Sequence, residues 1–205
     1  ALAEAVGAER RAALVPAVYR KQAPMPGGPM KVPTARYTDR KYHELEKEHL
    51  WKKVWQMACR LDDIPEVGDY YLYEVADIQY LIVRTGPDEF KAHINACLHR
   101  GRQLRDCSGR KAIEFRCPFH GWTWNIDGSL KHLVSEWDFP GVRESVAQLP
   151  GAKLAVWGGF IFINPDPDAG SLEEYMGPEM LAHYAKQKLE NRYIQANVVK
   201  VIRAN

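Results

Sequence analysis

The sequence predicts a mainly β fold with flanking helices, built around an antiparallel β domain. The central part of the chain holds short segments rich in β-branched and aromatic residues, as strands are: YYLYEV, IQYLIVR, FKAHINA, AIEFRC, KLAVW and FIFIN. Turn-forming pairs separate them, namely Gly86–Pro87, Asp127–Gly128 and Gly158–Gly159, and the last two stand at hairpin-like positions. Helical spacing of apolar residues occurs on either side of this region.

The flanking segments divide the chain into three parts. Apolar and charged residues alternate at helical spacing over residues 1–20, a Pro- and Gly-rich arm follows at 21–33, and helical spacing resumes at 38–55. We therefore predict an N-terminal helical segment and extended arm at 1–59 and the β domain at 60–164. Residues 165–205 contain a helical stretch and then strand-like residues. We predict that they form a linker and the start of a catalytic domain that is largely absent.

Charge and hydropathy narrow the choice of partners. The 205 residues include 28 Lys and Arg against 26 Asp and Glu, and this net charge of +2 gives no general reason to expect a nucleic acid or a membrane surface. No apolar run approaches the roughly 18 residues that span a bilayer, and the charged first residues lack the apolar centre of a secretory signal. We therefore expect a cytoplasmic protein. Four cysteines are too few for a disulfide scaffold.

The segment from Cys97 to Trp122 carries two pairs of metal-ligand residues. Cys97 and His99 form a Cys-x-His pair, and Cys117 and His120 form a Cys-x-x-His pair after 17 intervening residues. Two such pairs on separate loops can bring four ligands to one point. Either a tetrahedral zinc ion or an iron–sulfur cluster could bind there.

The composition of each pair favours the iron–sulfur cluster. In a Rieske-type [2Fe–2S] centre two thiolates bind one iron and two imidazoles bind the other, so that each loop donates one ligand of each kind. Zinc fingers of the Cys2His2 kind instead group both cysteines in one pair. Gly101 and Gly121 allow close approach of the backbone, whose N–H groups can then point at the sulfurs. Trp122 and Trp124 can limit the access of water.

The motifs CLHRG and CPFHGW resemble those of the large (α) subunit of the Rieske non-haem iron oxygenases, which include the aromatic-ring-hydroxylating dioxygenases. The segments KEHLWKKVWQMACRLDDIPEVGDY and GGFIFINPDPDAGSLEEYMG are also similar to this family. The resemblance implies a Rieske [2Fe–2S] domain with two cluster-binding hairpin loops. It implies that Cys97 and Cys117 hold one iron and that His99 and His120 hold the other. The neighbouring residues that it marks at the cluster are Arg100, Gly101, Gly121 and Trp122.

The resemblance also implies partners and a second metal. Members of the family are homo-oligomers, trimer-like in arrangement. Each Rieske domain receives electrons, ultimately from NAD(P)H, through a reductase or ferredoxin, and it reduces a mononuclear iron in a neighbouring subunit. His120 would face that subunit, where an acidic side chain would accept its free ring N–H. The parent reaction would be dihydroxylation or monooxygenation, including O-demethylation, of an aromatic or similar apolar substrate.

The mononuclear iron needs a triad of two histidines and one carboxylate, and the sequence offers none. His43 and His49 lie beside acidic residues, but we interpret them as part of a solvated or half-buried helix face. We therefore assign no catalytic residue to this chain. Mononuclear Fe(II) is expected only in a longer parent protein.

The ligand set also bears on the reduction potential of the cluster. Neutral imidazoles remove negative charge and raise the potential to roughly −150 to +300 mV, against about −400 mV for plant-type ferredoxins. Rieske proteins of the cytochrome complexes lie at the upper end of this range of potentials and carry an additional disulfide. The positions that correspond to its two cysteines are occupied here by Arg102 and Phe119. The resemblance therefore implies a lower-potential, oxygenase-like cluster. Phe119 also departs from the Tyr of many family members.

Several other residues have simpler interpretations. Cys59 is expected in the core and Cys107 on an exposed loop. Between Cys97 and His120 six basic residues stand against two acidic ones, and they either attract an acidic electron donor or belong to solvated loops: Arg100, Arg102, Arg105, Arg110, Lys111 and Arg116. The core is also expected to contain Trp51, Trp55, Trp137 and Trp157.

Two alternative functions remain open at this point. A stand-alone Rieske ferredoxin would use the same cluster without catalysis, but about 60 residues before the β domain and about 40 after it exceed what such a carrier needs. A zinc-stabilised binding module would use the same four ligands and would be colourless.

Overall fold

The computed structural model describes residues 31–203, which divide into two units between Tyr42 and His43. The helix predicted at residues 1–20 and most of the predicted arm lie outside the described residues. A short helix, α2 (Ala35–Thr38), precedes α3 (Arg40–Glu46), which continues as one turn of π-helix, η2 (Lys47–Trp51). The helix predicted to run to residue 55 thus ends earlier. The Gln56 side-chain amide caps it by donating to the carbonyl of Trp51 at 2.7 Å.

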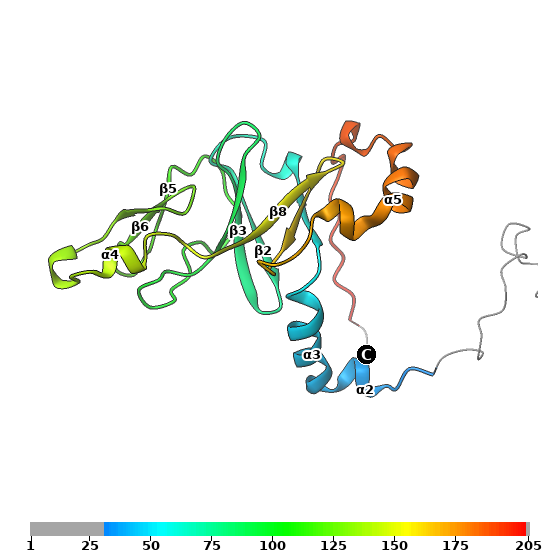
Figure 1. Cartoon of the computed structure of the whole chain (residues 1–205), viewed down its shortest axis with the longest axis horizontal. Helices are drawn as coiled ribbons and strands as arrows, with labels where there is room; N and C mark the ends of the chain where they lie inside the picture. The colour runs from blue at the N-terminus through cyan, green and yellow to red at the C-terminus, as the bar shows by residue number, and fades with distance from the viewer. Residues whose placement is uncertain (1–30, 204–205) are drawn as a thin grey trace, which may run out of the picture. The chain divides into compact units, whose positions relative to one another are not determined.

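The larger of the two sheets in the second unit has six antiparallel strands, which confirms the predicted fold class (Figure 1). Its strands, in spatial order, are β1 (Gln56–Arg60), β9 (Phe160–Asn164), β8 (Gly151–Trp157), β4 (Phe90–Ile94), β3 (Ile78–Arg84) and β2 (Tyr70–Val75). A single turn of 3₁₀ helix, η3 (Leu61–Asp63), follows β1. The strand β1 pairs with β9 although it lies before the predicted boundary at residue 60.

Two-residue turns close two hairpins of this sheet. Gly158 and Gly159 connect β8 to β9 with φ values of +58° and +81°, as the sequence predicted for this pair. Ala76 and Asp77 connect β2 to β3 with φ values of +52° and +63°, without any glycine. Both turns have the left-handed conformation that matches the twist of the strands they join.

A second, three-stranded sheet carries the chain through the candidate site. It consists of β5 (Glu114–Arg116), β6 (Thr123–Asn125) and β7 (Leu130–His132), with β6 in the middle. Two short helices follow it, η4 (Glu136–Asp138) and α4 (Val142–Ser145). Figure 1 shows β5, β6 and α4 on one side of β3, and β8 and α5 on the other. The strands β6 and β7 were not predicted, whereas the predicted turn at Asp127–Gly128 does connect them.

Strand β3 contributes to two separate cores because both of its faces are buried. Leu81 and Val83 pack into the cluster that also contains Cys97 and Cys117. Tyr80 and Ile82 belong to the cluster on the opposite face. Successive side chains of a strand point to opposite faces, so a strand covered on both sides has a continuous apolar sequence. Burial on both faces therefore explains why the run YLIV in β3 contains no charged residue.

His93 connects the two sheets. It lies on β4, is 2% exposed, and its Nε2 is 3.0 Å from the carbonyl oxygen of Ile126, in the turn between β6 and β7. Burial lowers the pKa of His93, so the ring is neutral and Nε2 donates to the carbonyl. Gly128 has φ +86°, and a Cβ there would lie 2.5 Å from His93 Cε1. Glycine thus permits the close contact of the turn with His93.

The segment after β9 contains one longer helix, α5 (Leu172–Ala185), which confirms the helical stretch predicted near Leu172. Ser171 and Glu174 form a capping box at its start, and Gly177 interrupts the helix with φ +73° just before Pro178. A 3₁₀ turn, η5 (Leu189–Asn191), follows.

The strand predicted after η5 is absent from residues 192–203, whose backbone is without regular structure. Its apolar side chains are exposed, with Val199 at 83% and Val201 at 92%. A strand-like sequence forms a strand only when a neighbouring strand satisfies its backbone. Within residues 31–203 no helix has both the length and the apolar character to cross a membrane.

Asp69 holds the segment between the two ligand pairs against the six-stranded sheet. The carboxylate is 1% exposed and accepts hydrogen bonds from Arg110 Nη1 at 2.8 Å, from the Lys111 N–H at 3.0 Å and from the Glu66 N–H at 3.0 Å. Burial by itself would raise the pKa of Asp69, but these three donors lower it below its ordinary value.

Replacing Asp69 by Asn should destabilise the protein by about 2–3 kcal/mol, because one amide oxygen cannot serve three donors. Urea unfolding at pH 7 measures this loss. The matched control is Arg110→Gln, which removes only the exposed partner and should cost about 1 kcal/mol or less. Equal losses in the two variants would contradict the central role of the buried carboxylate.

Candidate metal centre

Two loops with the same backbone geometry carry the four predicted ligands. In the first, the Cys97 N–H donates to the carbonyl of Arg102 at 2.8 Å and the Gly101 N–H donates to the carbonyl of Cys97 at 2.8 Å. In the second, the Cys117 N–H donates to the carbonyl of Trp122 at 2.8 Å, and the Gly121 N–H donates to that of Cys117 at 3.1 Å. Each cysteine thus opens a five-residue turn that ends in glycine.

The two loops differ in how the strands hold them. The second loop is a hairpin connection between β5 and β6, as predicted. The first is part of a long connection between β4 and β5. Gly101 and Gly121 have φ values of +70° and +77°, a conformation that favours glycine. The glycine N–H groups donate to the cysteine carbonyls and not to the sulfurs. The need for a positive φ therefore explains why glycine occupies both positions.

The two cysteine thiols are buried together. Cys97 is 2% exposed, Cys117 is 3% exposed, and the two thiols are hydrogen-bonded to each other. Burial raises the pKa of the Cys97 thiol to about 11, and the adjacent Cys117 contributes to the increase. The backbone N–H groups of His99 and Arg100 act in the opposite direction, because they donate to the Cys97 sulfur. These donors are suited to a metal-bound thiolate.

The two imidazoles lie side by side at the edge of this buried pair. The ring centroids of His99 and His120 are 4.7 Å apart. Trp122, from the second loop, stacks on His99 of the first loop with centroids 4.6 Å apart and planes 13° apart, and Phe139 contacts the same ring edge-on. His120 instead lies against the exposed ring of Phe119, at 3.8 Å between centroids. Both histidines are half-buried, but aromatic rings cover His99 on two sides, whereas His120 packs on an exposed ring.

The Nδ1 atom of His99 is buried and has no hydrogen-bond partner among the described residues. Burial lowers the pKa of His99, and the neighbouring His120 and Arg100 lower it further. The ring is therefore neutral, the form that binds metals. Because buried polar atoms normally have a partner, coordination to a metal would account for this nitrogen.

The arrangement fits a binuclear cluster better than a single ion. Within residues 31–203 no three His, Cys, Asp or Glu side chains converge closely enough to hold one metal ion. A Rieske-type cluster takes only two protein ligands on each iron, and the side chains here form a buried thiol pair and a separate imidazole pair.

The structure confirms some of the other predictions and corrects others. Trp122 and Trp124 are 3% and 0% exposed, as expected of residues that limit water access. Cys59 is buried and Cys107 exposed, as predicted; burial raises the pKa of Cys59 to about 12. His43 and His49 are exposed.

The prediction that four tryptophans belong to the core was wrong for two of them. Trp55 is 8% exposed, but Trp51 and Trp137 are 36% and 81% exposed. Trp137 lies in the short helix η4, beyond the three-stranded sheet, and no strand covers it.

One of the six basic residues between the ligand pairs points inward. Arg105 is half-buried and bonds to backbone carbonyls, whereas Arg100, Arg102 and Arg116 are exposed. The prediction for the six basic residues gave Arg105 no structural role, and the buried Asn95 that precedes Cys97 was not predicted at all. An asparagine directly after a strand and two residues before a predicted ligand was the available signal, because such side chains often bond to a nearby loop.

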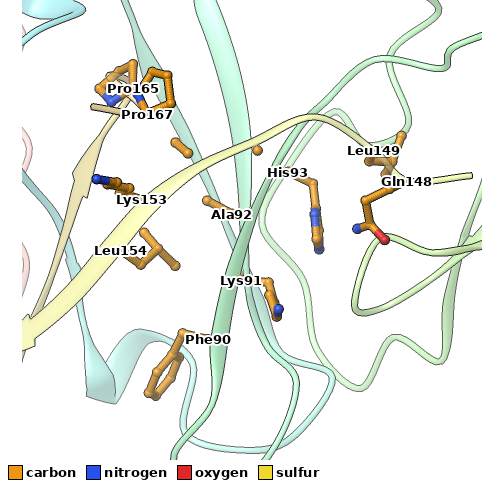
Figure 2. Close-up of a pocket in the computed structure, with 12 residues that line it drawn as sticks. Phe90, Lys91, Ala92, His93, Gln148, Leu149, Lys153, Leu154, Pro165 and Pro167 are labelled. Atoms are coloured by element: carbon orange, nitrogen blue, oxygen red, sulfur yellow. The ribbon is translucent and has the colours of Figure 1, made fainter. Parts of the chain in front are cut away.

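A separate pocket lies where β4 and β8 meet the segment after β9, shown in Figure 2. Phe90, Ala92 and Leu154 give it an apolar wall, and Lys91 and Lys153 lie on it. The figure shows the ring of His93 between β4 and Gln148. None of the predicted ligands lines this pocket, so it is not part of the metal centre.

Comparison with known proteins identifies the domain. Residues 54–140 match the Rieske [2Fe-2S] domain family. The oxygenase subunit of carnitine monooxygenase from Escherichia coli (strain K12) is 32% identical over 145 residues, which cover 71% of this chain and 39% of that protein. Chloroplastic choline monooxygenase from Spinacia oleracea is 34% identical over 142 residues, covering 69% and 31% of the two chains.

Solved structures agree with this assignment. The naphthalene 1,2-dioxygenase from Rhodococcus sp. bound to indole superposes with a TM-score of 0.67 and 35% identity, over 75% of this chain and 36% of that one. The chain spans less than half the length of each of these relatives. The match includes both loops that carry the buried thiol pair and the imidazole pair. Residues 54–140 therefore form a Rieske [2Fe–2S] domain, and over this domain the chain is similar to the oxygenases named above.

Proposed function

We propose that Cys97 and Cys117 hold one iron of the [2Fe–2S] cluster and that His99 and His120 hold the other. The observation that carries this proposal is the pairing of two equally closed loops, each of which supplies one thiol and one imidazole. When bound, such a cluster takes up and releases one electron at a time. The domain would thus serve electron transfer.

The surrounding side chains suit this role. Trp122 and Phe139 exclude water from His99, and the core encloses both cysteines. His120 and Phe119 lie at the surface, where another protein can approach the site closely. Electrons would therefore enter and leave through the His120 side.

For the whole protein we propose an oxygenase α subunit. Its Rieske domain would relay electrons from a reductase or ferredoxin to a mononuclear iron in a neighbouring subunit of a trimer-like homo-oligomer. The relatives named above support an oxygenase, since they include two monooxygenases and a dioxygenase. The substrate could be aromatic, or a quaternary ammonium compound like carnitine. The cytoplasm is the expected compartment because NAD(P)H would supply the electrons.

The exposed arginines favour an acidic electron donor. Arg100, Arg102 and Arg116 are all exposed on or beside the two ligand loops. Complementary charge accelerates the encounter of such partners and makes it sensitive to salt. The stand-alone ferredoxin is less well supported, because the relatives named above are longer oxygenase proteins.

Metal content tests the proposed function directly. Protein purified without exposure to oxidants should be brown, contain two irons and two acid-labile sulfides per chain, and give an EPR signal after reduction. Zinc as the only metal, or a colourless protein after reconstitution with iron and sulfide, would overturn the proposal.

Cys117→Ser should abolish the cluster, because a hydroxyl is a far poorer ligand than a thiolate. The visible absorption spectrum measures this loss. Cys107→Ser is the matched control: Cys107 is exposed on the loop between the pairs and should be replaceable without effect. A Cys117→Ser variant with the full spectrum would refute the assignment of this ligand.

His120→Ala should remove the cluster or change the g-values of its reduced EPR signal, because the iron loses an imidazole. The exposed His132 provides the control, and His132→Ala should leave the signal unchanged. Unchanged g-values in the His120 variant would exclude imidazole ligation at this position.

The midpoint potential should lie in the lower part of the Rieske range of roughly −150 to +300 mV, since no disulfide can join positions 102 and 119. A redox titration followed by visible absorption provides the value. A potential above about +250 mV would argue for a cluster of the cytochrome-complex type.

A further inference from the structure

Asn95 closes the base of the first ligand loop. Its side chain is 3% exposed, and its Oδ1 accepts hydrogen bonds from the N–H groups of Leu104 at 3.1 Å and Arg105 at 2.9 Å. Its Nδ2 donates to the carbonyl of Arg105 at 2.6 Å and to Gln79 Oε1 at 3.2 Å. One amide therefore ties both ends of the segment 95–105, which contains Cys97 and His99, to the start of β3.

Arg105 connects this closed loop to the strand that leads into the second loop. Its Nη1 donates to the carbonyl of Leu104 at 2.8 Å, and its Nη2 donates to the carbonyl of Glu114, on β5, at 2.9 Å. A longer bond of 3.5 Å reaches the carbonyl of Arg116, the residue before Cys117. The guanidinium also lies 5.2 Å from the centroid of the Phe115 ring.

These contacts form one continuous connection between the two ligand pairs. Asn95 holds the backbone of Arg105, and the Arg105 side chain holds β5, which ends immediately before Cys117. The planar guanidinium carries N–H donors on separate nitrogens in a fixed fork, which suits it to binding carbonyls on two different segments at once, whereas the donors of a lysine share one nitrogen. A lysine at this position would keep the charge but lose the second attachment.

Arg105 also places a positive charge one residue from Cys117, because its guanidinium bonds to the backbone carbonyl of Arg116 at 3.5 Å. The three hydrogen bonds described above for the Arg105 guanidinium all go to backbone carbonyls, which carry no full charge. The Glu114 carboxylate pairs with Lys131 Nζ at 2.7 Å, and the charge of Arg105 contributes less than Lys131 does to lowering the pKa of Glu114. Reduction of a cluster adds a negative charge, and a fixed positive charge nearby favours the reduced state.

We propose that Arg105, anchored by Asn95, is a positioning residue that sets the separation of the two ligand loops and raises the reduction potential of the cluster. This inference rests on the proposed function, because it concerns the same four ligands. It adds to that function a residue that touches none of them and acts through the loops.

The test compares four variants of the 205-residue chain with the wild type, three at arginines and a fourth, Asn95→Ala. Arg105→Gln removes both the charge and the double attachment, Arg105→Lys keeps the charge, and Arg102→Gln removes the same charge from an exposed position on the same loop. Two quantities are measured in each: the midpoint potential, by redox titration, and the rate of cluster loss to an iron chelator, by visible absorption. Far-UV circular dichroism establishes that each variant is folded.

Arg105→Gln should lower the midpoint potential and lose its cluster about 10-fold faster or more, as expected for a residue that supports metal ligands. Arg105→Lys should keep a potential close to that of the wild type but lose its cluster faster. Arg102→Gln should match the wild type in cluster lifetime and change the potential less than Arg105→Gln does. Asn95→Ala should accelerate cluster loss as Arg105→Lys does, since it frees the backbone of Arg105.

Wild-type potential and cluster lifetime in a folded Arg105→Gln variant would overturn the inference. An equal fall in potential in Arg102→Gln would overturn it too, because the effect would then come from general surface charge. A wild-type protein without iron–sulfur absorption would overturn the proposed function, and the role of Arg105 with it. The two failures are thus distinguishable.

Discussion

The separation of the two ligand loops is the constraint on which the rest of the site depends. Each loop is closed internally by two backbone hydrogen bonds, and these bonds are local to five or six residues. They cannot determine where the loops lie relative to each other. That separation comes from contacts between the loops: the Cys97–Cys117 thiol pair, the stacking of Trp122 on His99, and the bonds from Arg105 to β5.

The two sheets supply the platform for these contacts. Strand β3, buried on both faces, joins the core around the cysteines to the core on the opposite face. Asp69 fastens the long connection between the loops to this platform, and His93 joins the platform to the turn between β6 and β7. The site is thus built on paired strands, and its ligands project from loops whose ends are held. Such support favours a fixed ligand geometry.

The burial of the site is uneven, and this unevenness suits electron transfer. The thiol side is enclosed by apolar residues, whereas His120 and Phe119 are close to solvent. A cluster whose exposed ligands are neutral imidazoles presents little charge to an approaching protein. The exposed arginines around it then determine the sign of the local field, and the half-buried Arg105 adds a positive charge on the connection between the two loops.

The sequence by itself determined the type of centre and most of the strands. One cysteine and one histidine in each short motif, followed by glycine, depend only on local chain geometry, and long strands such as β2, β3 and β9 match their predicted segments. Three-residue strands such as β6 and β7 are too short to show a period of two, β1 directly follows a helical pattern, and residues 192–203 have a strand-like sequence without a neighbouring strand. Only the tertiary structure decided that Arg105 points inward while Arg102 is exposed. The two arginines have similar sequence surroundings, and their difference arises from carbonyl groups on β5 that the fold brings beneath one of them.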